Sequence, residues 1–240
     1  MDILNLVIDV GNTYAKAGLF SDDRQVKHAD QLSDRDILKL VREEKPHKVL
    51  VSSVRKGTLR LIKKIAVYAQ VSLLTHQTPL PFRNLYETPQ TLGTDRIAGV
   101  AGAIFLFPDH PCLIIDAGTS ITYDYLDAEG NYHGGSISPG LEMRFKALHK
   151  FTSKLPKISF NKNYDLTGKT TKGAILSGVI GGTVAEMTGI IQKYEQFSSD
   201  LRIIMNGGDA IFFETKIKGH IFAVQNLVMV GLNQIIKFNA

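Results

Sequence analysis

Two short stretches of this 240-residue chain carry residues that could bind phosphate groups. Asp9 and Gly11 follow an apolar run near the start, and Asp116 and Gly118 follow another apolar run a little under half a chain length later. An aspartate at the end of such a run can hold a cation or a water, and a glycine lets backbone N–H groups approach an anion closely. Asparagine and threonine beside the glycines add short donors for phosphate oxygens.

A single Asp-x-Gly is equally typical of a strand that ends in a turn. Two phosphate-binding units are the favoured interpretation, because the downstream pattern recurs as well. In each copy, two strand-like segments joined by a turn follow the Asp-x-Gly. These segments are residues 14–20 and 25–31 in the first copy, and residues 121–126 and 132–138 in the second. We therefore expect two copies of one unit, each opening with three strands and holding its Asp-x-Gly loop between the first two.

The elements that must position the first loop alternate between helix and strand. Ser33 followed by Asp36 has the spacing of a capping box, and Pro46 should end that helix. Residues 48–54 and 71–74 predict strands. Residues 59–69 predict an amphipathic helix between them, with Leu59 on its apolar side.

A helix is also predicted from residue 96 to residue 107, closed by Pro108. Asp95 then lies at or just before its amino terminus, where the helix dipole stabilises a negative charge. The alternative is that Asp95 or Thr94 serves only as the N-cap, a common role for both residue types. Arg96 could pair with an anion or lie in solvent.

The second half should add a helix over residues 141–149, a strand over 202–205 and a last helix over 226–238. Asn206-Gly207-Gly208-Asp209 follows that strand and is a third candidate loop for nucleotide contact. A long helix beginning at Thr171 contains five glycines, each costing about 1 kcal/mol relative to alanine. Either another helix or backbone approaches it very closely, for instance across a subunit interface, or it breaks near Gly181 and Gly182.

Composition indicates a globular protein with an anionic ligand. The net charge is +5 and 44% of the residues are hydrophobic, so nucleic-acid binding is not predicted, although residues 144–169 are rich in lysine. Cys112 is the only cysteine, which excludes an intramolecular disulfide and fits a cytoplasmic protein. We expect no signal peptide and no membrane partner, because apolar stretches such as residues 97–107 are too short to cross a bilayer.

Three stretches together resemble the type III pantothenate kinase family. They are Asp9-Val10-Gly11-Asn12-Thr13, Gly93-Thr94-Asp95-Arg96, and the segment from Asp116 to Thr122. Supporting stretches are residues 86–89 and 134–141, and the resemblance covers nearly the whole chain in order.

That resemblance implies an α/β protein with the duplicated actin-like ATPase (ribonuclease H-like) fold of the sugar-kinase superfamily. Each of two lobes, residues 1–108 and 109–240, would hold a mixed β-sheet with flanking helices. The implied activity is ATP-dependent phosphorylation of pantothenate to 4'-phosphopantothenate, the first step of coenzyme A biosynthesis. ATP would be held between the two Asp-x-Gly loops.

The resemblance also implies roles for individual residues. Asp95 would be the general base, and Asp116 would bind a monovalent cation, K⁺ or NH₄⁺. ATP would contact Asp9, Val10, Gly11, Asn12, Thr13, Tyr14, Ala15, Lys16 and Thr119. Pantothenate would contact Tyr86, Gly93, Thr94, Asp95, Arg96 and Thr171, although Thr170 next to Thr171 leaves that last assignment open.

Mg²⁺ is expected with ATP, and a homodimer with the glycine-rich helix near its interface is implied by the family. Two alternatives remain at this point. The first is a kinase of another small hydroxylated acceptor, because fold alone does not select the substrate. The second is a non-catalytic nucleotide-binding protein that assists transcription.

Overall fold

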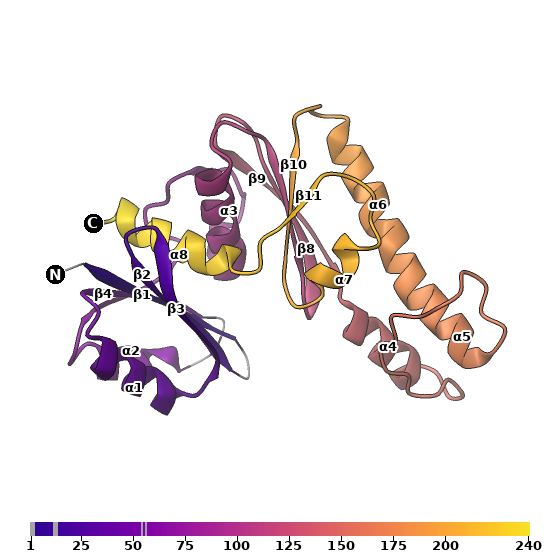
Figure 1. Ribbon diagram of the computed structural model, residues 1–240, viewed down its shortest axis with the longest axis horizontal. Coiled ribbons are helices and arrows are strands. Elements are labelled where there is room, and N and C mark those ends of the chain that lie inside the picture. The colour runs from indigo at the N-terminus through magenta and orange to yellow at the C-terminus, as the bar shows by residue number, and fades with distance from the viewer. Residues whose placement is uncertain (1–2, 12–13, 54, 56) are drawn as a thin grey trace. The chain divides into compact units, whose positions relative to one another are not determined.

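The computed structural model describes residues 3–11, 14–53, 55 and 57–240 (Figure 1). The chain divides into two compact units. The first contains Met1–Pro108, Gly130–His133 and Asn226–Ala240, and the second contains Asp109–Glu129 and Gly134–Gln225. The predicted division into lobes of residues 1–108 and 109–240 stays a prediction, and by packing the last helix belongs with the first unit.

The first unit is built on a five-stranded sheet in the order β3-β2-β1-β4-β5. β1 pairs antiparallel with β2 and parallel with β4, so the mixed sheet expected of each unit is present. Alternate residues of a strand point to opposite faces, which places Leu6 and Ile8 against the helices α1 and α2, while Asp9 points to the other face. The bounds are β1 (Leu4–Val10), β2 (Ala15–Ser21), β3 (Arg24–Leu32), α1 (Asp34–Glu44), β4 (Lys48–Ser53), α2 (Thr58–Ile65) and β5 (Gln70–Leu73).

The predicted start of α1 is confirmed, and the prediction for α2 is partly wrong. Ser33 caps α1 in a full capping box with Asp36, and the helix ends before Pro46. The helix α2 ends at Ile65, four residues short of the prediction, and Leu59 is 64% exposed. The buried face runs through Thr58, Leu61 and Ile65, because Leu61 and Ile65 pack into the core of the first unit.

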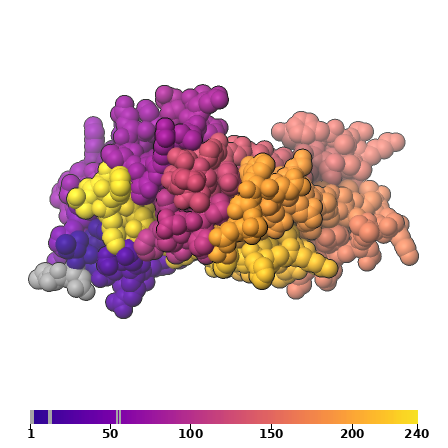
Figure 2. All heavy atoms as spheres, turned by 90° about the horizontal axis from the view of Figure 1, so that it is seen from above, coloured from indigo at the N-terminus to yellow at the C-terminus, as the bar shows by residue number. Residues whose placement is uncertain are grey.

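The helices α3 (Thr94–Leu106) and α8 (Leu227–Phe238) pack against each other within the first unit. Two glycines allow this close contact, because a Cβ at Gly102 would collide with the Leu227 carbonyl and one at Gly231 with the Ala98 carbonyl. Figure 2 shows the yellow C-terminal helix seated among the purple segments of this unit. The short strand β6 (Arg83–Asn84) and the 3₁₀ turn η1 (Pro89–Thr91) lie between β5 and α3.

The second unit repeats the strand order of the first. Five strands of its six-stranded sheet run in the order β11-β10-β7-β8-β9, and the short strand β6 follows at the edge beside β9. β7 is antiparallel to β8 and parallel to β10. The central pair β1–β4 of the first unit thus corresponds to the pair β7–β10 here. The bounds are β7 (Cys112–Ala117), β8 (Ser120–Leu126), β9 (Asn131–Pro139), α4 (Leu141–Lys150), β10 (Arg202–Asn206), α7 (Ala210–Glu214) and β11 (Ile221–Ala223).

The glycine-rich helix does not break. It runs as α5 (Thr171–Leu176), a π-helical turn η2 (Ser177–Gly181) and α6 (Gly182–Glu195). By length and apolar composition alone, residues 171–195 could cross a membrane, and 39% of the most apolar window is buried in the structure. Core helices of soluble proteins pass the same test, and this helix carries a carboxylate that pairs inside its own unit.

That carboxylate is Glu186, which ties the long helix to the second sheet. Its oxygens accept hydrogen bonds from Tyr123 (3.2 Å), Ser138 (2.6 Å) and Arg144 (2.6 Å). Burial alone would raise the pKa of Glu186, but the hydrogen bonds from Ser138 and Arg144 lower it below the usual value. Ionised Glu186 therefore stabilises the folded unit.

Candidate active-site residues in the two units

Asp9, Ser52 and Thr94 form a hydrogen-bonded chain in the first unit. Asp9, the penultimate residue of β1, is in register with Ser52 of the parallel strand β4, so both side chains point to the same face. The Ser52 hydroxyl donates to Oδ1 of Asp9 over 2.9 Å and lies 2.9 Å from Oγ1 of Thr94. The start of α3 is thereby linked to the end of β1.

The environment of Asp9 favours a cation. Burial raises the pKa of Asp9, the Ser52 hydrogen bond opposes this rise, and the negative charge of Asp95 adds to it. No described residue hydrogen-bonds to Oδ2 of Asp9. The Asp9 carboxylate is partly buried, has one oxygen without a described hydrogen-bond partner, and lies close enough to Asp95 for the two negative charges to interact. These features fit Mg²⁺, which prefers hard oxygen ligands.

Asp95 lies in the first turn of α3, where Gly93 is the N-cap residue. Neither Asp95 nor Thr94 is the N-cap, so the interpretation of either as only a cap is wrong. The backbone N–H of Arg96 donates to Oδ1 of Asp95 over 2.9 Å. A Cβ at Gly93 would collide with that same oxygen, so glycine is needed for this carboxylate position.

Arg96 is buried and packs beside Tyr86, so the alternative that it lies in solvent is wrong. Its guanidinium carbon lies 5.6 Å from the centroid of the Tyr86 ring. Tyr86 in turn stacks on Tyr132, with ring centroids 6.2 Å apart. The structure therefore brings the predicted substrate residues Tyr86 and Arg96 together, and it adds Tyr132, which the sequence did not single out.

The first loop is described in part. Asn12 and Thr13 lie outside the described residues, and the N–H of Gly11 donates to the Tyr14 carbonyl over 3.1 Å. Val10 and Ala15 are core residues, so only their backbone groups could meet a ligand. Tyr14 is exposed, and Lys16 is an exposed residue whose ammonium lies 4.0 Å from Asp30.

The second unit has the same arrangement at the end of β7. Asp116 is in register with Asn206 of the parallel strand β10, and Nδ2 of Asn206 donates to Oδ2 of Asp116 over 2.8 Å. Gly207 has φ +98°, and a Cβ there would collide with the Ala117 carbonyl. The Asp209 N–H donates to that carbonyl over 2.9 Å. The third predicted loop therefore packs directly on the second Asp-x-Gly loop.

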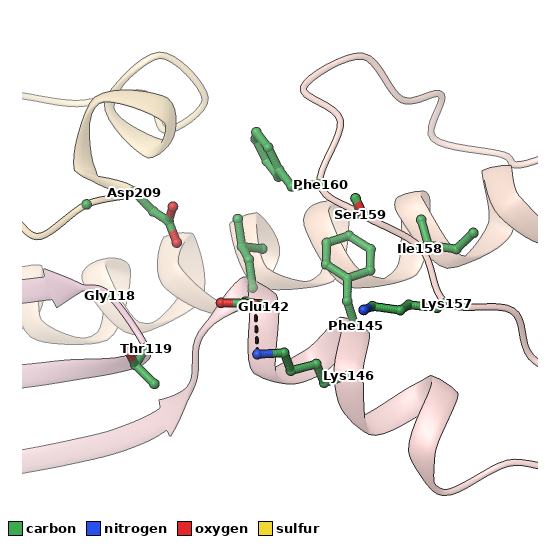
Figure 3. A pocket seen from close by; sticks show the side chains of 12 residues that line it. Gly118, Thr119, Glu142, Phe145, Lys146, Lys157, Ile158, Ser159, Phe160 and Asp209 are labelled. Carbon is green, nitrogen blue, oxygen red and sulfur yellow. Dashed lines mark ion pairs between the residues drawn. The ribbon is translucent and has the colours of Figure 1, made fainter. Parts of the chain in front are cut away.

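A cavity of about 590 Å³ opens beside these two loops, entirely within the second unit. Figure 3 shows Thr119 and Asp209 toward one end and Phe145, Ile158 and Phe160 toward the other. Burial, and then the charge of Glu142, raises the pKa of Asp209. The lining residues are Gly118, Thr119, Leu141, Glu142, Phe145, Lys146, Lys157, Ile158, Ser159, Phe160, Gly208 and Asp209.

This cavity suits a molecule with one charged end and one flat apolar end. Backbone groups of Gly118 and Gly208 can approach an anion, while two phenylalanines offer surfaces for a ring. Lys146, whose ammonium pairs with Glu142 at 2.7 Å, and Lys157 add positive charge. Thr119, predicted to contact ATP, lines this cavity. The walls formed by α4 and by residues 157–160 were recognised in the sequence only as part of a lysine-rich segment.

The remaining predicted residues are less closely tied to these sites. Thr170 caps α5 by accepting from the Gly173 N–H over 3.0 Å, which leaves Thr171 as the exposed first residue of that helix. Both belong to the second unit, whereas Tyr86 and Arg96 belong to the first. Among the described residues, no group of three or more His, Cys, Asp or Glu side chains could hold a metal ion. A cation at Asp116 would therefore need hydroxyl or carbonyl oxygens as further ligands.

Comparison with solved structures shows the fold of this protein. A Clostridium difficile activator of 2-hydroxyisocaproyl-CoA dehydratase, solved with ADPNP, matches 98% of the chain and 96% of its own length at TM-score 0.55 and 15% identity. A glucokinase from an Antarctic psychrotroph matches both chains in full at TM-score 0.54 and 11% identity. The fold is therefore that of the actin-like ATPases and sugar kinases, as the sequence predicted.

Sequence comparison then gives the family. A family model of type III pantothenate kinase matches residues 5–193. A type III pantothenate kinase of Cytophaga hutchinsonii is 43% identical over 98% of this chain and 100% of its own, and one of Phocaeicola vulgatus is 42% identical over 98% and 99%. The chain belongs to the type III pantothenate kinase family and is a kinase.

One structural neighbour bears on the alternative of a transcription protein. A Campylobacter jejuni protein described as a candidate transcriptional activator of the Baf family matches 98% of both chains at TM-score 0.66 and 23% identity. That likeness shows the fold alone. The family places this chain among enzymes, so the non-catalytic alternative is set aside.

Proposed function

We propose that this protein transfers the γ-phosphoryl group of ATP to pantothenate, giving 4'-phosphopantothenate in the first step of coenzyme A biosynthesis. The observation that carries the proposal is the start of α3. There Asp95, with its carboxylate over Gly93, lies next to buried Arg96 and its partner Tyr86. A carboxylate beside a cationic and aromatic surface suits an acceptor that has a hydroxyl group and a carboxylate of its own.

Asp95 acts as the general base in this proposal. The primary hydroxyl of pantothenate gives its proton to the Asp95 carboxylate while its oxygen attacks the γ-phosphorus and the bond to ADP breaks. Phosphoryl transfer depends mainly on positioning and on charge neutralisation. Arg96, held in place by Tyr86 and Tyr132, orients the acceptor through its carboxylate, and Tyr86, Gly93, Thr94 and Thr171 complete the acceptor contacts.

Both Asp-x-Gly loops contact the phosphate groups of ATP in the proposed complex. The first uses residues 9–16 and the second uses Thr119, and the cavity of the second unit takes the base and ribose. Mg²⁺ bound with ATP would neutralise phosphate charge, and Asp9 is the residue whose carboxylate fits it. Asp116 would hold the monovalent cation, K⁺ or NH₄⁺, with Asn206 fixing one of its oxygens.

A cytoplasmic homodimer is part of the proposal. Ala174, Gly178, Gly182 and Ala185 are exposed on the long helix, and a Cβ added at Gly178 or Gly182 would meet no described atom within 4 Å. An open, small-residue face allows the same helix of a second copy to come close. Cys112 is a buried free thiol whose pKa burial raises to about 12, so it stays protonated and is a poor nucleophile.

The function is tested by ADP release from Mg²⁺-ATP with and without pantothenate, first in potassium and then in sodium buffer. Pantothenate-dependent release that needs potassium supports the activity and the role of Asp116 together. Release without a cation effect supports the activity and removes that role. Release only with another acceptor from a panel of small hydroxylated compounds overturns the choice of pantothenate.

The dimer is tested by light scattering coupled to gel filtration. Gly182→Arg places a large cation on the open face of the helix and should give monomers. Glu195→Arg, an exposed position on the other side of the same helix, is the matched control and should leave the mass unchanged. A wild-type protein that runs as a monomer would contradict the proposal.

A further inference from the structure

Ser52 is a fully buried residue whose hydroxyl contacts both Asp9 near the end of β1 and Thr94 at the start of α3. Its exposed fraction is 0%, and its neighbours Asp9 and Thr94 each lie 2.9 Å from its Oγ. Nothing in the predicted motifs includes it, because it lies at the end of an ordinary apolar strand. All three residues belong to the first unit.

We infer that Ser52 is a positioning residue whose hydroxyl ties the carboxylate of Asp9 to the beginning of the helix that carries Asp95. The inference rests on the proposed function, since the role of Asp95 as base is part of it. Ser52 itself touches neither ATP nor the acceptor in this account, and it acts through Asp9 and Thr94.

The direction of the hydrogen bonds follows from the chemistry of the three groups. An ionised carboxylate only accepts, so the Ser52 O–H must donate to Asp9. The Ser52 oxygen then accepts from the Thr94 O–H, which gives a chain from Thr94 through Ser52 to Asp9. Serine can do this because a hydroxyl both donates and accepts, whereas alanine breaks both bonds.

The hydrogen-bonded chain holds two groups in place, the Asp9 carboxylate and the first turn of α3. Oδ1 of Asp9 is held by Ser52 of β4, which restricts the rotation of the carboxylate that the proposed function assigns to Mg²⁺. Thr94 precedes Asp95 directly, so fixing the Thr94 side chain limits how far the first turn of α3 can shift. A small displacement of a catalytic group lowers turnover strongly, because the reacting atoms must lie within about 3–3.5 Å.

The experiment compares Ser52→Ala with Ser53→Ala. Ser53 is the next residue of β4, and its hydroxyl contacts Oγ1 of Thr58 and the N–H of Arg55 instead of Asp9. We expect Ser52→Ala to lower kcat about 10- to 100-fold, the effect of losing a hydrogen bond to a charged group. The KM for pantothenate should change less than about threefold, and Ser53→Ala should keep kcat within about twofold.

A second measurement does not depend on turnover. Calorimetry with a non-hydrolysable ATP analogue, in Mg²⁺ and in EDTA, gives the gain in affinity that Mg²⁺ confers. Ser52→Ala should lose part of this gain, because Asp9 is no longer held, whereas Ser53→Ala should keep it. Ser52→Thr, which retains the Oγ, should recover both kcat and the Mg²⁺ gain.

The outcomes separate the two claims. If wild-type protein fails to phosphorylate pantothenate, the proposed function is wrong, and calorimetry still decides the role of Ser52. Wild-type kcat and an unchanged Mg²⁺ gain in Ser52→Ala would overturn the inference. Equal losses of kcat and of Tm in Ser52→Ala and Ser53→Ala would also overturn it, because they would indicate a general packing effect.

Discussion

Each unit places an aspartate at the corresponding position of its own sheet, but the two aspartates have different hydrogen-bond partners. In each, the penultimate residue of the central strand is an aspartate, and the in-register residue of the parallel neighbour donates a hydrogen bond to it. That residue is Ser52 in the first unit and Asn206 in the second. The hydroxyl of Ser52 also contacts Thr94, so Asp9 is linked to the start of α3. Asn206 is instead followed by Gly207 and Gly208, and this glycine loop lines the cavity of the second unit.

Under the proposed function, this difference would give the two copies different roles. The first unit gathers the groups suited to the acceptor and to proton transfer, namely Asp95, Arg96 and Tyr86. The second forms the cavity suited to a nucleotide. A duplicated scaffold can thus keep its backbone pattern while single residues next to the shared aspartate set each copy's role.

The largest effect is expected when the proposed base in the first unit is replaced. Asp95→Asn should lower kcat by about 10² to 10⁴, the range for removing a general base, and should leave ATP affinity unchanged. Steady-state kinetics and calorimetry measure the two quantities. Glu87→Gln, an exposed carboxylate in the same unit, is the control, and normal turnover in Asp95→Asn would remove Asp95 from its role.

The second expected effect concerns the cation at the other aspartate. Asp116→Asn should raise the potassium concentration for half-maximal activity at least about tenfold, and Asn206→Ala should raise it less, because it only orients Asp116. Activity titrations in potassium measure both. Neither change should alter the KM for pantothenate. A potassium dependence like that of the wild type in Asp116→Asn would mean that the cation binds elsewhere.

A third substitution sharpens the assignment of the cavity to the nucleotide. Phe160→Ala should raise the KM for ATP about 2- to 10-fold while kcat is kept, since one ring contact is lost. Phe197→Ala is the matched control, because Phe197 is exposed in the same unit and packs with Tyr125 and Tyr194 instead. An unchanged KM in Phe160→Ala would place the base outside this cavity.

The smallest expected effect is on the stability of the second unit. Glu186 has a lowered pKa in the folded protein, so its contribution is complete above the unfolded value near 4.5 and is lost as the pH falls through the folded pKa. Glu186→Gln should reduce the free energy of unfolding at pH 7 by about 1–2 kcal/mol. It should also weaken the fall in stability as the pH is lowered from 7 to 3. Denaturant melts between pH 3 and pH 7 measure this, and parallel curves for both proteins would contradict it.

The fold was predictable from the sequence because its signals are local and repeated. The recurring Asp-x-Gly, the capping box at Ser33 and the three-strand pattern each depend on residues close together in the chain. The end of α2 was predicted wrongly because its last turn has no strong stop signal, and packing of Leu61 rather than Leu59 decided its face.

The site was predictable only where a motif carried it. Asp9, Asp95, Asp116 and Arg96 belong to such motifs, but the motifs did not show that Arg96 would be buried against Tyr86. Ser52 and Tyr132 were missed because their importance depends on strand register and ring packing between distant segments. A polar residue at or next to the end of an apolar strand, as Asn206 and Ser52 are, is the sequence signal that could have found Ser52.

The packing of α8 on α3 also determines when the first unit can fold during synthesis. Gly102 and Gly231 meet across more than half the length of the chain, so the first unit cannot complete its core until the second has been translated. At the usual 5–20 residues per second, this delay is on the order of ten seconds. Throughout that interval, the side of α3 that packs on α8 in the folded unit has no α8 to pack against.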